Sequence, residues 1–308
     1  MSSAPVQFSY QEIVSVTNNF DDVNVIGKGG LGKVYKAKVS QSGEPVDVAV
    51  RRIDHSYWLQ DNAFAKEIEI LSKLKHKNLI SLVGFCDEND EILVINKHAA
   101  NASLFEHLSD PTLTWMRRLK ISAGVASALK YMHNHSVIHH NVSSTTILLD
   151  ENWEAKLSGF EFCMVIQEGH LDPAYERIGV GSYKSDTFSF GIVLFQILCG
   201  MKAFLSKDGT FQAPLAIFQY EDRKLHKLVD QDLYKQMDPQ SFNIFSAVAY
   251  DCLKERRAPP NMNQVLQRLE KALNFQEKYE NHEHSSTVVR KGPSNEMMST
   301  VVLEYVQV

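Results

Sequence analysis

The sequence predicts an α+β fold in which antiparallel strands and one main helix come first and a mainly helical part follows. Apolar residues alternate on both sides of a glycine-rich turn, and two apolar stretches flank a hairpin that turns at 87–90. Further along, apolar residues recur at helical spacing, in 113–133, 241–253 and 262–273. The change from a period of two to a period near 3.6 separates a strand-rich part from a helix-rich part.

Composition is that of an ordinary soluble protein. Of 308 residues, 44% are hydrophobic and 22% are charged, with a formal net charge of −5. This balance lacks the basic excess of a nucleic-acid binder, so we expect no nucleic-acid partner. Four cysteines without a C-x-x-C pair predict neither a zinc site nor a disulfide framework, which fits the reducing cytosol.

The sequence also bears on the relation to membranes. The longest apolar run, 190–199, is too short to cross a bilayer. We therefore expect a cytoplasmic protein that reaches the inner face of the plasma membrane only indirectly, through a partner. A receptor fragment separated from its membrane span would show the same features.

The first twenty residues are predicted to be a lead-in with one short helix. Ser9 and Glu12 have the spacing of a capping box, so a helix is expected through 13–16 before Asn18 and Asn19 end it.

A glycine-rich hairpin follows the lead-in. Gly27, Gly29 and Gly32 together with Val34 form the pattern G-x-G-x-x-G-x-V. Glycine lets the backbone approach the phosphates of a ligand without a Cβ in the way. The pattern alone is a weak signal, because glycine-rich hairpins occur for many reasons. The strand that follows it argues against a dinucleotide-binding fold, in which a helix would start at the glycines.

The next strand, 45–53, carries Ala49 and Arg51, and a helix that starts near Asp61 carries Glu67. We expect Arg51 and Glu67 to form an ion pair. The pair either only fixes the helix against the sheet or also holds a phosphate, and the sequence leaves both open.

Two further segments resemble the site of protein kinases. The stretch 139–150, HHNVSSTTILLD, resembles the catalytic loop H-R-D-x-x-x-x-N. On that resemblance Asn141 replaces the general-base Asp, Ser143 replaces a Lys, and Thr146 replaces the metal-binding Asn. In AKLSGFEF (155–162), Gly159 stands in place of the second metal-binding residue, an Asp.

Motifs elsewhere carry the same resemblance: F-S-Y-x-E-I, G-K-G-G-L-G-K-V-Y-K, K-H-K-N-L-I-S-L-V-G-F-C, K-S-D-x-x-S-F-G and C-L-K-E-R. Over residues 8–273 the chain resembles the cytoplasmic kinase domain of plant receptor-like kinases. This implies the bilobal protein kinase fold. A small lobe (21–97) would contain a five-stranded antiparallel sheet and one main helix, a larger, mainly α-helical lobe would span 98–275, and a polar, flexible tail would follow at 276–308. The resemblance also implies a nucleotide cleft with Ile95 as gatekeeper and Lys97 in the hinge, and it implies that Asp186 caps the catalytic-loop backbone.

The predicted site lacks the groups that transfer a phosphate. Asn141 cannot accept a proton from a substrate hydroxyl. Gly159 offers no metal ligand, and the Thr146 hydroxyl is a poor ligand for Mg²⁺. We therefore expect a pseudokinase, a degenerate receptor-like kinase that acts as a scaffold or allosteric partner of an active receptor-like kinase.

Cofactor expectations follow from the same residues. ATP binding without metal is compatible with the glycines and Ala49, whereas Mg²⁺ is not expected. The histidines clustered at 133–140 are expected to be structural, so we predict no metal site. The alternative is a weakly active serine/threonine kinase that uses Glu161 or Asp150 as a displaced metal ligand.

Overall fold

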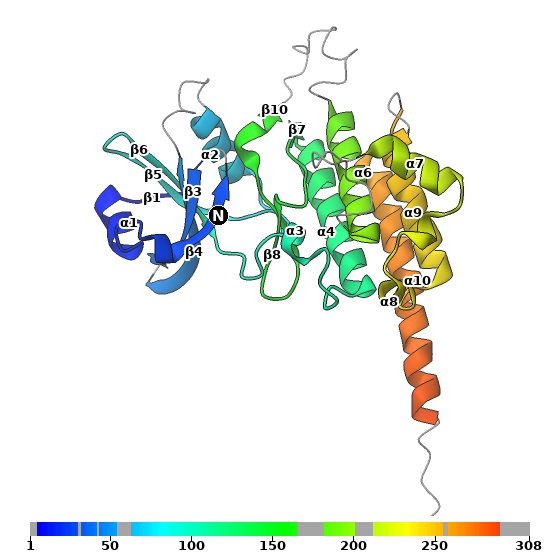
Figure 1. The fold of residues 1–308 in the computed structure, drawn as a ribbon. Helices are drawn as coiled ribbons and strands as arrows, with labels where there is room; N and C mark the ends of the chain where they lie inside the picture. Colours follow the sequence, from blue (N-terminus) through cyan, green and yellow to red (C-terminus); the bar gives the residue numbers. More distant parts are fainter. Residues whose placement is uncertain are drawn as a thin grey trace, which may run out of the picture.

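The computed structural model describes residues 5–29, 32–41, 43–53, 63–165, 182–200, 212–254 and 258–289. They form two lobes, one built on a sheet and one mainly of helices (Figure 1). The predicted α+β, two-lobed architecture is confirmed. The predicted helix start at Asp61 and the tail from 290 onward lie outside the described residues.

The first lobe is built on a six-stranded sheet with the strand order β1-β5-β6-β4-β3-β2. Its strands are β1 (Val6–Gln7), β2 (Val25–Gly29), β3 (Gly32–Gln41), β4 (Glu44–Ile53), β5 (Leu82–Glu88) and β6 (Glu91–Lys97). Strands β2 to β6 form the expected antiparallel set. The prediction of five strands misses β1, which pairs in parallel with β5.

The lead-in is therefore part of the first lobe. Helix α1 (Tyr10–Val16) begins as predicted, with the Ser9 hydroxyl accepting a hydrogen bond from the Glu12 N–H at 3.3 Å. Phe8, Ile13 and Phe20 are buried in one apolar cluster with residues of the sheet. The lead-in thus covers one face of the sheet, called the outer face below.

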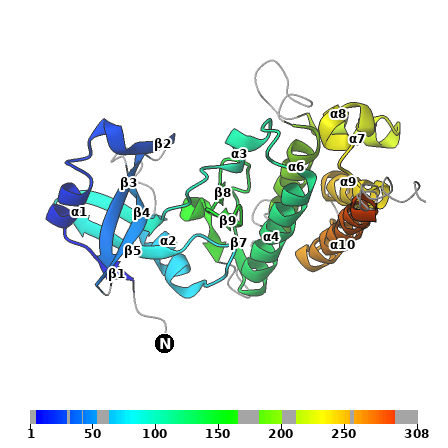
Figure 2. The same cartoon turned by 90° about the horizontal axis from the view of Figure 1, so that it is seen from below.

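The opposite face of the sheet, called the inner face below, is turned toward helix α2 (Ala63–Lys73) and the second lobe (Figure 2). Side chains alternate across a strand. Along β4, Val48 and Val50 lie in the outer cluster, whereas Ala49 and Arg51 point to the inner face. This alternation decides which residues can line the space between the lobes.

The second lobe packs around long helices. These are α4 (Trp115–Asn134), α6 (Tyr183–Cys199), α9 (Pro239–Lys254) and α10 (Met262–Val289), with shorter α3 (Leu104–His107), α7 (Ala213–Glu221) and α8 (Gln231–Tyr234) around them. Large buried side chains from three of the long helices fill its core, namely Trp115, Phe190, Phe195 and Phe245. Two small sheets, β7 (Val137–Ile138) with β10 (Met164–Val165) and β8 (Ile147–Leu149) with β9 (Ala155–Leu157), lie between these helices and the first lobe (Figures 1 and 2).

Helix α10 corrects the predicted start of the polar tail at 276. The helix continues to Val289, and Gln276 within it is fully buried. The Gln276 Oε1 accepts a hydrogen bond from the Asp238 N–H at 2.8 Å, and its Nε2 donates to the Gln236 carbonyl at 2.6 Å. The first residues of the predicted tail therefore belong to the folded lobe.

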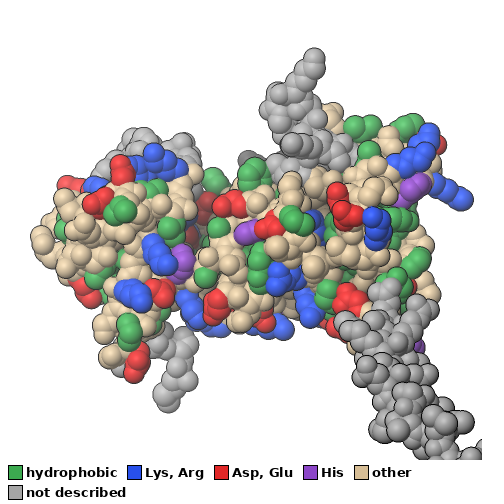
Figure 3. Space-filling model, turned by 60° about the horizontal axis from the view of Figure 1, so that its bottom comes forward, with side chains coloured by type: hydrophobic (Ala, Val, Ile, Leu, Met, Phe, Trp, Pro, Cys, Tyr) green, Lys and Arg blue, Asp and Glu red, His purple; other side chains and the backbone are tan. Residues whose placement is uncertain are grey.

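One face of the described part of the chain shows how charged and apolar side chains are distributed over the surface. On the face shown in Figure 3, acidic and basic side chains are interspersed over both lobes and apolar ones are scattered. Within the described residues, no helix combines the length and apolarity needed to span a bilayer.

Candidate functional site

Asp186 of α6 holds the loop that follows β7. Its carboxylate accepts hydrogen bonds from the N–H groups of His139 and His140, both at 2.8 Å, and contacts His133 Nε2 at 2.9 Å. Burial by itself raises the pKa of Asp186, but these hydrogen bonds outweigh it and hold the pKa below its usual value. The predicted role of Asp186 as a cap of this loop is confirmed.

His139 is a structural residue of the loop. It is fully buried, its Nδ1 accepts a hydrogen bond from the Asn141 N–H at 3.2 Å, and its Nε2 lies 2.8 Å from the Ser158 carbonyl. These partners require a neutral ring with the proton on Nε2. The pKa of His139 lies below its ordinary value, mainly because the ring is buried.

Thr146 closes the loop on itself. Its hydroxyl donates to the Asn141 carbonyl at 2.7 Å and accepts from the Ser143 N–H at 3.0 Å. The Ser143 hydroxyl lies 2.8 Å from that of Thr145. The two hydroxyls that replace an amide and an ammonium group are thus engaged within the loop.

Gly159 and Thr146 are adapted to each other. Gly159 has φ +88°, which favours glycine. A Cβ built on Gly159 would lie 2.8 Å from Thr146 Cγ2 and 3.2 Å from Asn141 Nδ2. The side chain that an Asp would need at this position has no room beside Thr146.

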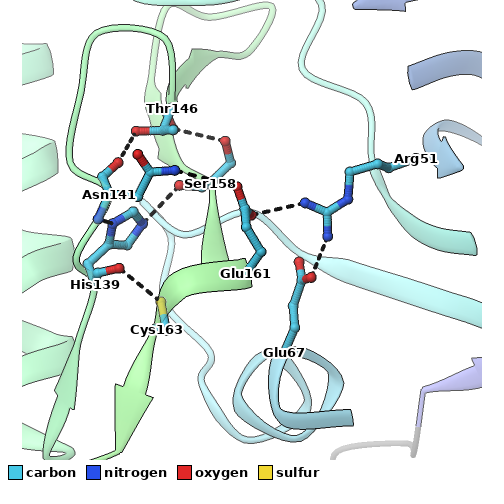
Figure 4. A network of polar contacts seen from close by, with 8 residues as sticks. All are labelled: Arg51, Glu67, His139, Asn141, Thr146, Ser158, Glu161 and Cys163. Atoms are coloured by element: carbon cyan, nitrogen blue, oxygen red, sulfur yellow. Dashed lines mark hydrogen bonds and ion pairs between the residues drawn. The ribbon is translucent and has the colours of Figure 1, made fainter. Parts of the chain in front are cut away.

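A buried group of three charges lies above the loop, between α2, β4 and the turn η3 (Phe160–Phe162) (Figure 4). The Arg51 guanidinium pairs with Glu67 through Nη2 and with Glu161 through Nη1, the latter at 2.9 Å. The exposed fraction of the Arg51 and Glu161 side chains is 16% each, and that of Glu67 is 4%. The predicted Arg51–Glu67 pair is confirmed, and Glu161 is a partner that the sequence did not reveal.

Burial and charge compete in this group. Burial opposes the charge on Arg51, but Glu67 and Glu161 keep its pKa above the ordinary value. Burial raises the pKa of Glu67, and the neighbouring Glu161 adds to this while Arg51 opposes it. Asn141 extends the group weakly, with its Nδ2 at 3.4 Å from Glu161 Oε1.

Comparison with known proteins identifies the family of this chain. A family model described as protein tyrosine and serine/threonine kinase matches residues 21–269. The chain belongs to this kinase family. It is also similar to curated proteins of Arabidopsis thaliana. The receptor-like protein kinase FERONIA is 37% identical over 89% of this chain and 33% of its own length. The receptor-like protein kinases ANXUR2 and ANXUR1 are each 38% identical over 90% of this chain and 35% of their own length. The chain spans about a third of the length of these relatives.

The register of β6 against β4 shows that one predicted site residue is wrong. Ile95, predicted as gatekeeper, is fully buried in the outer cluster and lies opposite Val50. Asn96 lies opposite Ala49 and therefore shares the inner face with Arg51. A shift of one residue along a strand turns the side chain to the other face, so the gatekeeper position is Asn96. The Asn96 Oδ1 is buried and has no hydrogen-bond partner among the described residues.

The other nucleotide-site candidates lie on neighbouring strands of the first lobe. Gly27 and Gly29 in β2 pair with Val34 and Gly32 in β3, and Val34 in turn lies opposite Arg51. Of the three glycines, Gly32 has φ +127°, which favours glycine.

The hinge residue Lys97 ends β6. Its side chain is exposed, and its N–H donates to the Ser81 carbonyl at 2.8 Å. Nucleotide binding by this cleft stays a prediction.

Asp150 was predicted as one possible displaced metal ligand, but its carboxylate is engaged elsewhere. Its Oδ1 accepts hydrogen bonds from the N–H groups of Asn152 and Glu154 at 2.9 Å, and its Oδ2 pairs with Lys156 Nζ at 3.1 Å. Asp150 therefore belongs to the β8–β9 turn. Among the described residues, no group of three or more His, Cys, Asp or Glu side chains is placed to hold a metal ion.

Proposed function

We propose that this kinase domain is a pseudokinase that acts as a scaffold or allosteric partner of an active receptor-like kinase. The observation that carries the proposal is that side chains of the protein itself occupy the positions where a kinase binds phosphate and metal. Glu161 occupies Arg51, and Thr146 fills the space beside Gly159. Phosphoryl transfer depends on metal ions and on precise placement of phosphates, and both need these positions free.

A second candidate is a weakly active serine/threonine kinase that uses Glu161 as a displaced metal ligand. Glu161 is the one of the two predicted carboxylates that reaches the site, with Asn141 at 3.4 Å. Its carboxylate is paired with Arg51, however, so a metal ion would have to compete with a buried guanidinium. The pseudokinase is therefore the better supported function.

We propose a cytoplasmic site of action, at the inner face of the plasma membrane through the partner. Similarity to the kinase portion of receptor-like protein kinases supports a partner of that class. Because the chain matches about a third of each relative, the activity of the whole relatives is not carried over.

The scaffold role is tested by adding the purified chain to the kinase domains of FERONIA, ANXUR1 and ANXUR2. We expect the autophosphorylation rate of at least one to change and to reach a plateau at equimolar chain. The control adds the same relative's own domain with its general-base Asp changed to Asn. Complexes absent from gel filtration, together with unchanged rates in all three, would contradict the scaffold role for this class of partner.

A further inference from the structure

We propose that Glu161 is an internal anion that takes the place of a nucleotide phosphate on Arg51 and so latches the two lobes together without nucleotide. The inference deepens the proposed function, on which it rests, because a scaffold acts through a fixed shape rather than through a bound substrate.

The latch joins parts of the chain that belong to different lobes. Arg51 lies in β4 of the first lobe, and Glu161 lies 110 residues later in η3, next to the catalytic loop (Figure 4). The backbone around Glu161 is held from the second lobe. Phe160 is buried in an apolar cluster that contains the core of that lobe and also residues of α2, and its ring packs edge-on against His139 at 5.4 Å between ring centroids. Glu161 therefore reaches Arg51 from a fixed base.

Arginine at position 51 explains why one side chain can bind both carboxylates. A guanidinium presents two terminal nitrogens in a planar fork, and here Nη2 takes Glu67 while Nη1 takes Glu161. The ammonium of a lysine is a single point charge on a flexible stem and has no such fork. The Arg at 51 and the Glu at 161 thus form one unit, although they lie far apart in the sequence.

The charge of this unit opposes a phosphate. One guanidinium and two carboxylates carry a net charge of −1 when all three are ionised. The three side chains are largely buried, so their interaction is screened less than on the surface. A phosphate oxygen that approached Arg51 would find both terminal nitrogens engaged and would face two carboxylates. A phosphate can therefore take the place of Glu161 on Arg51 Nη1 only by displacing that carboxylate.

The test is thermal melting of the purified chain with ATP, and separately with tripolyphosphate, in EDTA. Wild type should show no ligand-dependent rise in Tm at millimolar concentrations. Glu161→Gln should melt lower without ligand and should gain a rise of about 3 °C or more with ATP, because a ligand that binds only the folded state stabilises it. A response to tripolyphosphate as well would assign the gain to phosphate contacts with Arg51.

Glu91→Gln is the matched control. It removes a carboxylate from the neighbouring Arg52, whose Nε donates to Glu91 Oε2 at 2.8 Å within the first lobe. This variant should lose Tm without gaining a response to ATP. Arg51→Lys keeps the positive charge but removes the fork, so it should also gain a response, and it replaces Glu161→Gln if that variant fails to fold.

Three results would overturn the latch. The first is an equal ATP-dependent rise in Tm in wild type and in Glu161→Gln. The second is no rise in Tm in either Glu161→Gln or Arg51→Lys when each is shown to be folded. The third is a rise in Tm in Glu91→Gln as large as in Glu161→Gln. Phosphate transfer is measured separately. If the latch proposal fails, the prediction that the chain transfers no phosphate still stands. If wild type transfers phosphate, the pseudokinase proposal fails, but the competition between Glu161 and phosphate at Arg51 does not.

Discussion

At the scale of single residues, Gly159 and Thr146 show that two losses can depend on each other. Gly159→Ala should cost more free energy of unfolding than Gly43→Ala. Both glycines have φ +88°, but nothing lies within 4 Å of a Cβ at Gly43, whereas one at Gly159 meets Thr146. We expect about 1–2 kcal/mol for the backbone at both sites and about 1–3 kcal/mol more for the clash at Gly159.

Urea unfolding measures this difference. Thr146→Ser removes Cγ2 and keeps the hydroxyl that donates to Asn141, so in the Gly159→Ala background it should recover part of the loss. Equal costs at Gly43 and Gly159 would show that Thr146 does not fill the site.

The buried amide oxygen of Asn96 leads to a prediction about stability. Its Oδ1 is buried without a partner among the described residues, so Asn96→Leu, of similar shape, should raise the free energy of unfolding by about 1–3 kcal/mol. The control is Asn78→Leu, which should lower it because the Asn78 Nδ2 donates to the Ala155 carbonyl at 3.0 Å. Thermal melting of both variants checks the signs, and a lower Tm for Asn96→Leu would refute the prediction.

His139 should make stability depend on pH in the weakly acidic range. Burial lowers its pKa below the ordinary value of 6.5, so below pH 6.5 the unfolded chain binds a proton that the folded chain does not. Stability is therefore complete above pH 6.5 and falls as the pH drops toward the folded pKa, by up to about 1.4 kcal/mol per pH unit.

The pKa values of His76 and His98 are also lowered, mainly by burial, and act in the same direction. His139→Gln isolates the share of His139, since its amide can still donate to Ser158. Unfolding free energies measured from pH 7.5 to 5.5 should depend less steeply on pH in this variant than in wild type. Parallel curves would mean that His139 does not contribute.

At the scale of elements, local patterns were predictable and the register of β6 was not. The Ser9 cap of α1 and the turn between β5 and β6 depend on neighbours in sequence, and both were predicted. Ile92, Leu93, Val94 and Ile95 are all buried, because β6 is covered on both faces. A strand buried on both faces has no readable alternation, so the sequence could not show which of Ile95 and Asn96 faces the cleft.

Helix α10 was cut short in prediction because polar residues follow Leu273. Gln276→Ala should lower the free energy of unfolding by about 1–3 kcal/mol, since two partly buried backbone groups, of Asp238 and Gln236, would lose their partner. Glu277→Ala, at an exposed neighbouring position, is the control with an expected change near zero. A chain that ends at Phe275 should melt lower for the same reason, and an unchanged Tm would contradict the account.

At the scale of the whole molecule, the site is defined by contacts between lobes. Arg51, Glu67, Asn141, Thr146 and Gly159 were identified from motifs, because each motif keeps its place along the chain. The contact of Arg51 with Glu161 was not, because it joins residues 110 positions apart and exists only when two lobes are packed together. In the proposed latch, the two lobes are joined by their own charges at Arg51, where an active kinase would hold a nucleotide phosphate.

Whether the chain is a pseudokinase is tested by the transfer of labelled γ-phosphate from ATP by the purified chain. It is run with Mg²⁺ and with Mn²⁺, and an active receptor-like kinase domain serves as positive control. A pseudokinase should give incorporation equal to that of a reaction without protein, for wild type and for Glu161→Ala alike. Incorporation above that background in wild type, abolished in Glu161→Ala, would contradict the account and establish a kinase that uses Glu161 as its metal ligand.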